Sequence, residues 1–216
     1  MPRLSAVVIA GENGCKTQKE EDQETAMISA LGRPLIDYVL VALRGSREVS
    51  EVIVSVTGST PLTESHVRSR GYQSIIVPGM GYDADLRHVF SLLSTPYVLT
   101  VAANLPLLRS ESIDDVVSAF YRSKRSSLLV GVPIDEVQET IIEPAMIKDM
   151  NGVKAIPCGI SVIDRNLSMN NSYLDESYLV SDLEDFAVDV NNIGQLKQAE
   201  RILRARRWHE RSPTEE

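Results

Sequence analysis

Short, almost continuous apolar runs alternate along the chain with longer segments that have helical periodicity. Five of these runs are rich in β-branched residues and predict strands over 4–10, 51–57, 73–78, 97–103 and 127–133. Apolar runs without polar alternation are typical of parallel strands that are covered on both faces.

The intervening segments predict helices. In 33–45, apolar side chains recur every three or four residues behind Pro34, which suits the first position of a helix. A second apolar stripe covers 110–124, where Ser112 and Asp115 have the spacing of a capping box. These two helices, and a weaker helical pattern downstream of the third strand, alternate with the strands as in βαβ units.

The weaker helical pattern spans about 82–94, and the regular alternation ends after residue 133. A further strand-like run covers 153–164, and a helical pattern with six basic and two acidic residues covers 192–211. We interpret the basic face of this last helix as a solvated surface, and contact with a phosphate or an acidic partner is the alternative. The pattern as a whole predicts an α/β fold with a mainly parallel, doubly wound sheet. We expect a single domain over 1–208 and a disordered tail over 209–216.

Composition narrows the class of protein. The 216 residues include 43% hydrophobic and 24% charged residues, close to the globular average, which excludes fibrous and disordered chains. The net charge of −8 argues against a nucleic-acid-binding protein, which needs a basic surface. Two cysteines exclude a disulfide framework, and the three histidines have no metal-ligand spacing.

No segment predicts a membrane span or a signal peptide. The stretch 88–108 lacks charged residues, but Pro96, Asn104 and Pro106 interrupt it. A helix end, a turn and a buried strand explain this stretch better than a span. We expect a cytoplasmic protein with no membrane contact.

Ligands of open α/β sheets bind beyond the carboxyl ends of the strands, which directs attention to four loops. The first loop follows the first strand, and its glycines let backbone N–H groups point at an anion while its lysines add positive charge. It matches neither G-x-G-x-x-G nor a Walker loop, and a plain surface loop is the alternative. Its candidate nucleotide-binding residues are Gly11, Glu12, Asn13, Gly14, Lys16 and Lys19.

The loop 78–86 is a second candidate for contacts with the nucleotide. Gly79 and Gly81 permit unusual backbone dihedral angles. The loop can contact a base or ribose, and the alternative is that Asp83 or Asp85 caps the next helix.

Two further loops carry candidate metal ligands. A carboxylate at the end of the strand 97–103 would suit Mg²⁺, but the residue there is Asn104, a neutral amide that can also serve as a turn residue. In 188–192, Asp189 and Asn191 are candidate metal or substrate ligands, and Asn192 alternatively caps the last helix.

Several segments resemble nucleotidyltransferases that include the molybdenum-cofactor guanylyltransferases. The closer resemblance is to the archaeal GTP:adenosylcobinamide-phosphate guanylyltransferases of cobalamin assembly, and it covers about 4–205. The segments that carry it are GRPLIDYVLVAL (32–43), GMGYDADL (79–86), YVLTVAANLPLL (97–108), IPCGISVID (156–164) and VDVNNIGQLKQAERIL (188–203).

This resemblance implies a GT-A-like fold, Mg²⁺, and transfer of GMP from GTP to a phosphorylated acceptor with release of pyrophosphate. It places Lys16 at a catalytic cation position, and Asn104 and Asp189 near the metal. It also implies that the nucleotide lies near Gly79, Gly81 and Asp85 and the acceptor near Pro157, Gly159 and Asn191.

The chain departs from the family pattern at positions that matter for chemistry. Glu12 replaces a glycine, Lys16 an arginine, Thr25 a lysine and Asn104 an acidic residue. From 11 to 27 the chain has two lysines and five acidic residues, a formal charge of −3. Two hypotheses remain: an active nucleotidyltransferase with an altered site, or a non-catalytic homologue that binds a nucleotide or a partner. A dinucleotide-binding Rossmann domain is a weaker third reading, because its glycine motif is absent.

Overall fold

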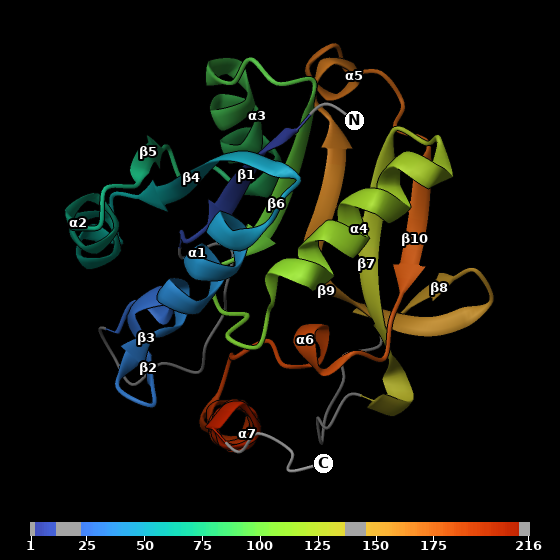
Figure 1. The fold of residues 1–216 in the computed structure, drawn as a ribbon. Helices are drawn as coiled ribbons and strands as arrows, with labels where there is room; N and C mark the ends of the chain where they lie inside the picture. The colour runs from blue at the N-terminus through green and yellow to red at the C-terminus, as the bar shows by residue number, and fades with distance from the viewer. Residues whose placement is uncertain (1–2, 12–22, 137–145, 212–216) are drawn as a thin grey trace.

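The computed structural model describes residues 3–11, 23–136 and 146–211 (Figure 1). Within these residues, seven strands form a sheet in the order β10-β7-β9-β6-β1-β4-β5, and β8 pairs with β9 at its side. The strands are β1 (Leu4–Ile9), β4 (Val49–Thr57), β5 (Gln73–Val77), β6 (Tyr97–Ala102), β7 (Ser127–Pro133), β8 (Lys148–Met150), β9 (Val153–Asp164) and β10 (Glu176–Val180).

The sheet is mainly parallel, as predicted. Strand β1 pairs in parallel with both β4 and β6, β4 with β5, and β7 with β10. Strand β9 is inserted between β6 and β7 and runs antiparallel to both. The carboxyl ends of the parallel strands therefore meet along one edge of the sheet.

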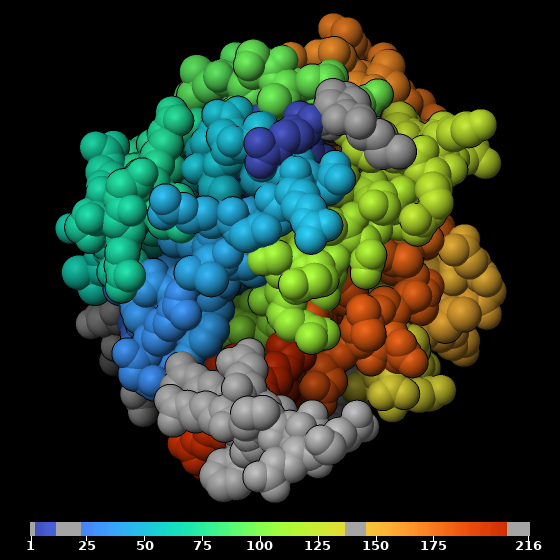
Figure 2. Space-filling model, viewed as in Figure 1, coloured from blue at the N-terminus to red at the C-terminus, as the bar shows by residue number. Residues whose placement is uncertain are grey.

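Helices cover both faces of the sheet, which explains the lack of polar alternation in its strands. Along β1, Leu4, Ala6 and Val8 belong to the core under one helical layer, and Val7 belongs to the core under the other. Figure 2 shows the molecule from the side of this first layer. This layer contains α1 (Leu35–Gly45), α2 (Pro61–Ser69), α4 (Ser110–Ser123) and α6 (Glu184–Ala187), and the opposite layer contains α3 (Tyr82–Leu92) and α5 (Arg165–Met169).

The last helix, α7 (Ile193–Arg211), packs at the carboxyl edge of the sheet. Its Ala199 and Leu203 share a small apolar cluster with Leu107 and with the ribbon formed by β2 (Ser29–Ala30) and β3 (Arg33–Pro34). Asn192 caps this helix, the alternative role considered for it, since its Oδ1 accepts a hydrogen bond from the Gln195 amide at 3.0 Å.

Two local predictions were wrong. Pro34 pairs in β3 and directly precedes α1, so it is not the first helical residue. The helix α4 begins at Ser110, which excludes a capping box at Ser112; the Ser112 hydroxyl donates to Asp185 instead. No helix in the described ranges is long and apolar enough to cross a bilayer.

Candidate functional site

A pocket opens at the carboxyl ends of β1, β4 and β5, where α3 begins. It is a shallow hollow, and the space of about 330 Å³ between its walls includes open solvent. Its lining residues are Ile9, Gly11, Ser55, Thr57, Val77, Tyr82, Asp85 and Leu86. The pocket therefore joins Gly11 from the first predicted loop to Asp85 from the loop after β5. Sequence analysis did not single out the residues that β4 contributes.

Gly11 lies where the first loop passes over β4. A Cβ atom at this position would lie 2.8 Å from Cγ2 of Thr57, closer than real Cβ contacts. The glycine is thus needed for a close approach of the backbone to Thr57, and both residues line the pocket.

Asp85 fixes the glycine loop above the pocket. Its Oδ1 accepts hydrogen bonds from the backbone amides of Gly79 at 3.0 Å and Met80 at 3.2 Å. Gly79 and Gly81 have φ of 72° and 112°, the left-handed region in which glycine is favoured. The expectation that Asp83 or Asp85 caps α3 was wrong, because Gly81 holds the N-cap position and no side chain bonds there.

A second cluster forms beyond the end of β6, where three predicted residues meet. Asn104 is fully buried, and its Nδ2 donates to the Asp189 carboxylate, to the Val190 carbonyl at 3.1 Å and to Asn191 Oδ1 at 3.2 Å. The Val190 amide in turn donates to the Asn104 carbonyl at 3.0 Å. The other end of the amide, Asn104 Oδ1, is buried without a hydrogen-bond partner.

The chemistry of this second cluster suits a hard cation. Carboxylate and amide oxygens are ligands that Mg²⁺ accepts, and this ion is commonly held by one or two carboxylates together with substrate phosphates. In the parts of the chain that the structure describes, no three His, Cys, Asp or Glu side chains gather as a metal site. A cation here would therefore depend on Asp189, on amide oxygens and on a bound phosphate.

The segment 157–159 of β9 lies on the same edge of the sheet. Gly159 has φ of 78°, and a Cβ there would lie 2.8 Å from Cβ of Ala102, the last residue of β6. Pro157 pairs with Gly131 of β7. Burial, with a smaller contribution from the negative charge of Asp189, raises the pKa of the Cys158 thiol to about 12, so the thiol stays protonated near neutral pH.

The central part of the first loop lies outside the described residues, and with it Glu12, Asn13, Gly14, Lys16 and Lys19. The structure describes the chain again from residue 23, and Thr25 begins a short 3₁₀ turn.

The Glu24 side chain bonds the N-terminus of α2. Its carboxylate accepts hydrogen bonds from the amides of Leu62 at 2.7 Å and Thr63 at 2.6 Å, at the N-terminus of α2. The charge of −3 assigned to the loop therefore overstated what faces a ligand, because one of its five acidic residues stabilises a helix N-terminus.

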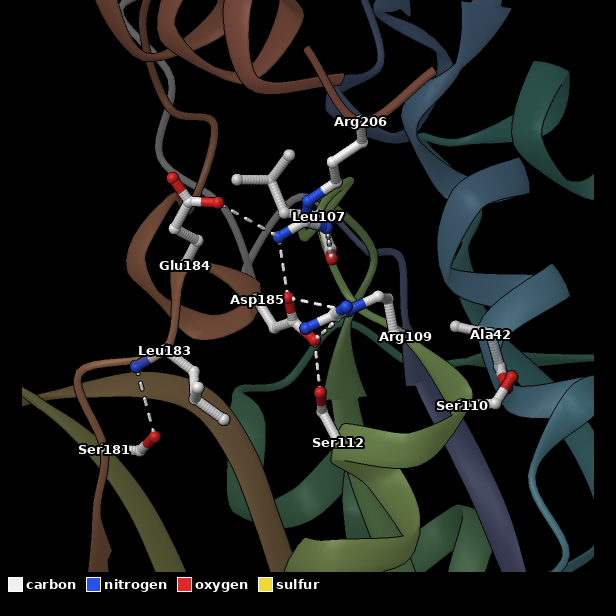
Figure 3. A network of polar contacts seen from close by, with 10 residues as sticks. All are labelled: Ala42, Leu107, Arg109, Ser110, Ser112, Ser181, Leu183, Glu184, Asp185 and Arg206. Atoms are coloured by element: carbon white, nitrogen blue, oxygen red, sulfur yellow. Dashed lines mark hydrogen bonds and ion pairs between the residues drawn. The ribbon is translucent and has the colours of Figure 1, made fainter. Parts of the chain in front are cut away.

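A buried carboxylate ties the C-terminal helices to the start of α4 (Figure 3). Asp185 is fully buried and accepts hydrogen bonds from Arg109 Nε at 2.8 and 3.1 Å, from Arg206 at 2.7 Å and from the Ser112 hydroxyl. The bond to Asp185 raises the pKa of the Arg109 guanidinium. We call these four residues the Asp185 clasp.

The Asp185 clasp joins α4, α6 and α7, and Arg206 also donates to the Leu107 carbonyl at 2.6 Å. The clasp thereby fixes α6, from which the chain continues directly to Asp189. One residue of the basic last helix is thus part of a buried network, which corrects the expectation that this helix shows only a solvated basic face.

Comparison with known proteins gives one family match. Residues 6–153 match the sequence model of the MobA-like NTP transferase domain. No curated protein sequence matches the chain.

Solved structures share the fold at low identity. CMP:2-keto-3-deoxy-manno-octonic acid synthetase complexed with CTP has a TM-score of 0.70 and 13% identity, over 94% of this chain and 99% of that one. The 4-diphosphocytidyl-2C-methyl-D-erythritol synthase from Anaerococcus prevotii has a TM-score of 0.67 and 12% identity, over 94% and 96%. HddC from Yersinia pseudotuberculosis has a TM-score of 0.68 and 12% identity, over 93% and 99%.

Proposed function

Because the chain belongs to the MobA-like NTP transferase domain family, we propose that it transfers a nucleotidyl group from a nucleoside triphosphate to a phosphorylated small molecule. The observation that carries this proposal is the pocket at the carboxyl edge of the sheet, which is lined by Gly11 and Asp85. Ligands of open α/β sheets bind at this edge. The Asn104–Asp189 cluster lies on the same edge, beyond the end of β6.

We propose GTP as the donor and adenosylcobinamide phosphate as the acceptor, on the resemblance of segments 79–86 and 188–203 to guanylyltransferases. Two of the structural neighbours are named for cytidine nucleotides, so CTP is the competing donor. The cytoplasm, where nucleoside triphosphates are plentiful, is the proposed location.

The proposed reaction is an attack on the α-phosphorus of the triphosphate. An oxygen of the acceptor phosphate forms the new bond to this phosphorus, the bond to the bridging oxygen breaks, and pyrophosphate leaves with the electron pair. Negative charge builds on the phosphate oxygens, and stabilising it accounts for most of the catalysis in reactions of this type. Lys16 and Lys19 are the proposed cationic side chains for this charge.

The proposed ligands of a divalent cation are Asp189, Asn191 and Asn104. When bound, this cation supplies positive charge beside the phosphates. The acceptor is proposed to lie against Pro157, Gly159 and Asn191, on the β9 side of the same edge.

The departures at Glu12, Thr25 and Asn104 favour a second candidate function, a non-catalytic homologue that binds a nucleotide. An assay of pyrophosphate release from each of the four nucleoside triphosphates, with and without adenosylcobinamide phosphate, distinguishes the two candidate functions. Acceptor-dependent release supports the transferase. Nucleotide binding without release at any acceptor concentration supports the second candidate.

We expect the wild-type rate of nucleotidyl transfer to lie below about 1–10³ s⁻¹, the usual range of enzyme turnover numbers. Each missing group that would stabilise charge costs a factor of about 10²–10³ in rate. The double variant Glu12→Gly with Thr25→Lys changes the local charge by +2. It is expected to raise both nucleotide affinity and transfer rate by more than either single change alone, because both act on the same phosphates.

The control for this prediction is Glu176→Gln with Asp182→Asn, which changes the net charge equally at exposed positions near β10. A wild-type rate inside the usual range would contradict the expectation, as would an equal gain from the control pair.

A further inference from the structure

Segment 188–192 runs along the sheet edge between α6 and α7 and lies in neither a helix nor a strand. Val188 and Val190 are buried in the apolar cluster around Leu107, whereas Asp189 and Asn191 stay partly exposed. This alternation turns the two polar side chains toward Asn104, whose amide bonds both of them. The position of the two side chains therefore depends on how the ends of the segment are held.

One guanidinium bonds both sides of this segment. Arg206 lies on α7, and its Nη1 donates to the Leu107 carbonyl at 2.6 Å while its Nη2 donates to Asp185 Oδ1 at 2.7 Å (Figure 3). Asp185 lies on α6, just before the segment, and Leu107 lies in the loop after β6 that also carries Asn104. Arg206 therefore joins the helix after the segment to the helix before it and to the loop that faces it.

These bonds set Arg206 apart from the exposed arginines of α7. Its side chain is 23% exposed, and the carboxylate that it bonds is fully buried. The Arg204 side chain, at 69% exposure, lies 3.6 Å from Glu200 on the same helix, a surface pair of the kind that contributes little. A guanidinium donates from two nitrogens to two acceptors at once, which the single nitrogen of a lysine does not reproduce.

We propose that Arg206 is a positioning residue of the transfer site, which holds Asp189 and Asn191 against the loop after β6 by bonding Asp185 and Leu107 together. Arg206 lies outside residues 6–153, the part of the chain that matches the family model, so the family match assigns it no role. The claim about position concerns the fold alone. The effect on catalysis rests on the proposed function.

Hydrogen exchange tests the claim about position without a nucleotide. The probe is the Val190 amide, which donates to the Asn104 carbonyl at 3.0 Å, and the reference is the buried Val8 amide in the central strand β1. In Arg206→Lys, we expect the Val190 amide to exchange about 10-fold or more faster than in the wild type. The rate at Val8 should change far less, because only the segment opens more readily.

Arg204→Lys is the matched control, since it makes the same substitution at an exposed position of the same helix, and we expect wild-type exchange at both amides. Wild-type exchange at Val190 in Arg206→Lys would overturn the inference, because the charge opposite Asp185 would then suffice. An equal gain at Val190 and Val8 would also overturn it, because the arginine would then stabilise the whole fold. Arg206→Gln gives the same comparison if Arg206→Lys does not fold.

The effect on catalysis is measured as pyrophosphate release from GTP with adenosylcobinamide phosphate. We expect Arg206→Lys to lower kcat about 10-fold or more and to leave KM for GTP within about twofold, because other elements line the pocket at the ends of β1, β4 and β5. The stoichiometry of GTP binding counts the folded molecules. An unchanged kcat would overturn the role in catalysis. If the wild type releases no pyrophosphate, the proposed transfer fails, and hydrogen exchange still decides the claim about position.

Discussion

We expect Asp185→Asn to lower the free energy of unfolding by about 3 kcal/mol, the largest stability change among the variants considered. Removing one partner of a buried ion pair costs about 3–5 kcal/mol because the remaining charge is left uncompensated. The lower end applies here, since the Arg109 side chain is 56% exposed and water can solvate part of its charge. Arg206, at 23% exposure, is the more costly guanidinium to leave unpaired.

Denaturant titration measures this change directly. About 3 kcal/mol corresponds to a fall in melting temperature of about 6–12 °C for a chain of this size. The matched control is Glu184→Gln, because Glu184 is the neighbouring acid, is 64% exposed and lies 3.6 Å from Arg206. We expect the control to cost no more than about 1 kcal/mol. Equal losses from the two variants would show that the Asp185 clasp does not stabilise the fold as argued.

We expect Gly11→Ala to weaken nucleotide binding by about 10-fold or more. The new Cβ would lie 2.8 Å from Cγ2 of Thr57, so the loop backbone or the threonine has to move, and both line the pocket. Overpacking of this kind typically costs about 1–3 kcal/mol, and a loss of 1.4 kcal/mol in binding corresponds to a factor of 10.

Two companion variants separate this clash from a general effect of replacing glycine. Gly58 lies in the loop after β4, the strand that ends at Thr57. A Cβ at this position would meet no heavy atom within 4 Å, so we expect Gly58→Ala to bind nucleotide with wild-type affinity. Adding Thr57→Ser to Gly11→Ala removes the methyl group that clashes and is expected to recover most of the affinity. Isothermal titration measures all of them. A double variant as weak as Gly11→Ala would place the cause elsewhere.

The sheet could be predicted from the sequence because each strand carries its own signal. Two helical layers bury both faces of β1, so its residues read as a continuous apolar run. The direction of β9 could not be read in the same way, because an apolar run shows that a strand is buried but not which way it runs. The helix α2 was missed because only Thr63 and Val67 are buried on it, too few for a visible stripe.

The candidate site could likewise be predicted only in part. The convergence of Asn104 with Asp189 and Asn191 was expected from the family resemblance. A general rule about strand ends could place only Asn104, because the segment 188–192 follows α6 and not a strand. The Asp185 clasp had no comparable signal in the sequence, because its four members at 109, 112, 185 and 206 come together only through the packing of three helices. Ser112 and Glu24 were misread for the same reason, since each bonds a residue distant in sequence.

Isothermal titration of the wild-type chain with ATP, GTP, CTP and UTP, each with and without Mg²⁺, tests the central claim most directly. We expect one nucleotide, GTP, to bind at a single site, more tightly with Mg²⁺ than without it, and more weakly to Gly11→Ala. At about 100 times its dissociation constant, the bound nucleotide should stabilise the fold by about 2.7 kcal/mol in a parallel melting experiment. If none of the four binds at millimolar concentration in either condition, the edge pocket is not a nucleotide site and the account is wrong.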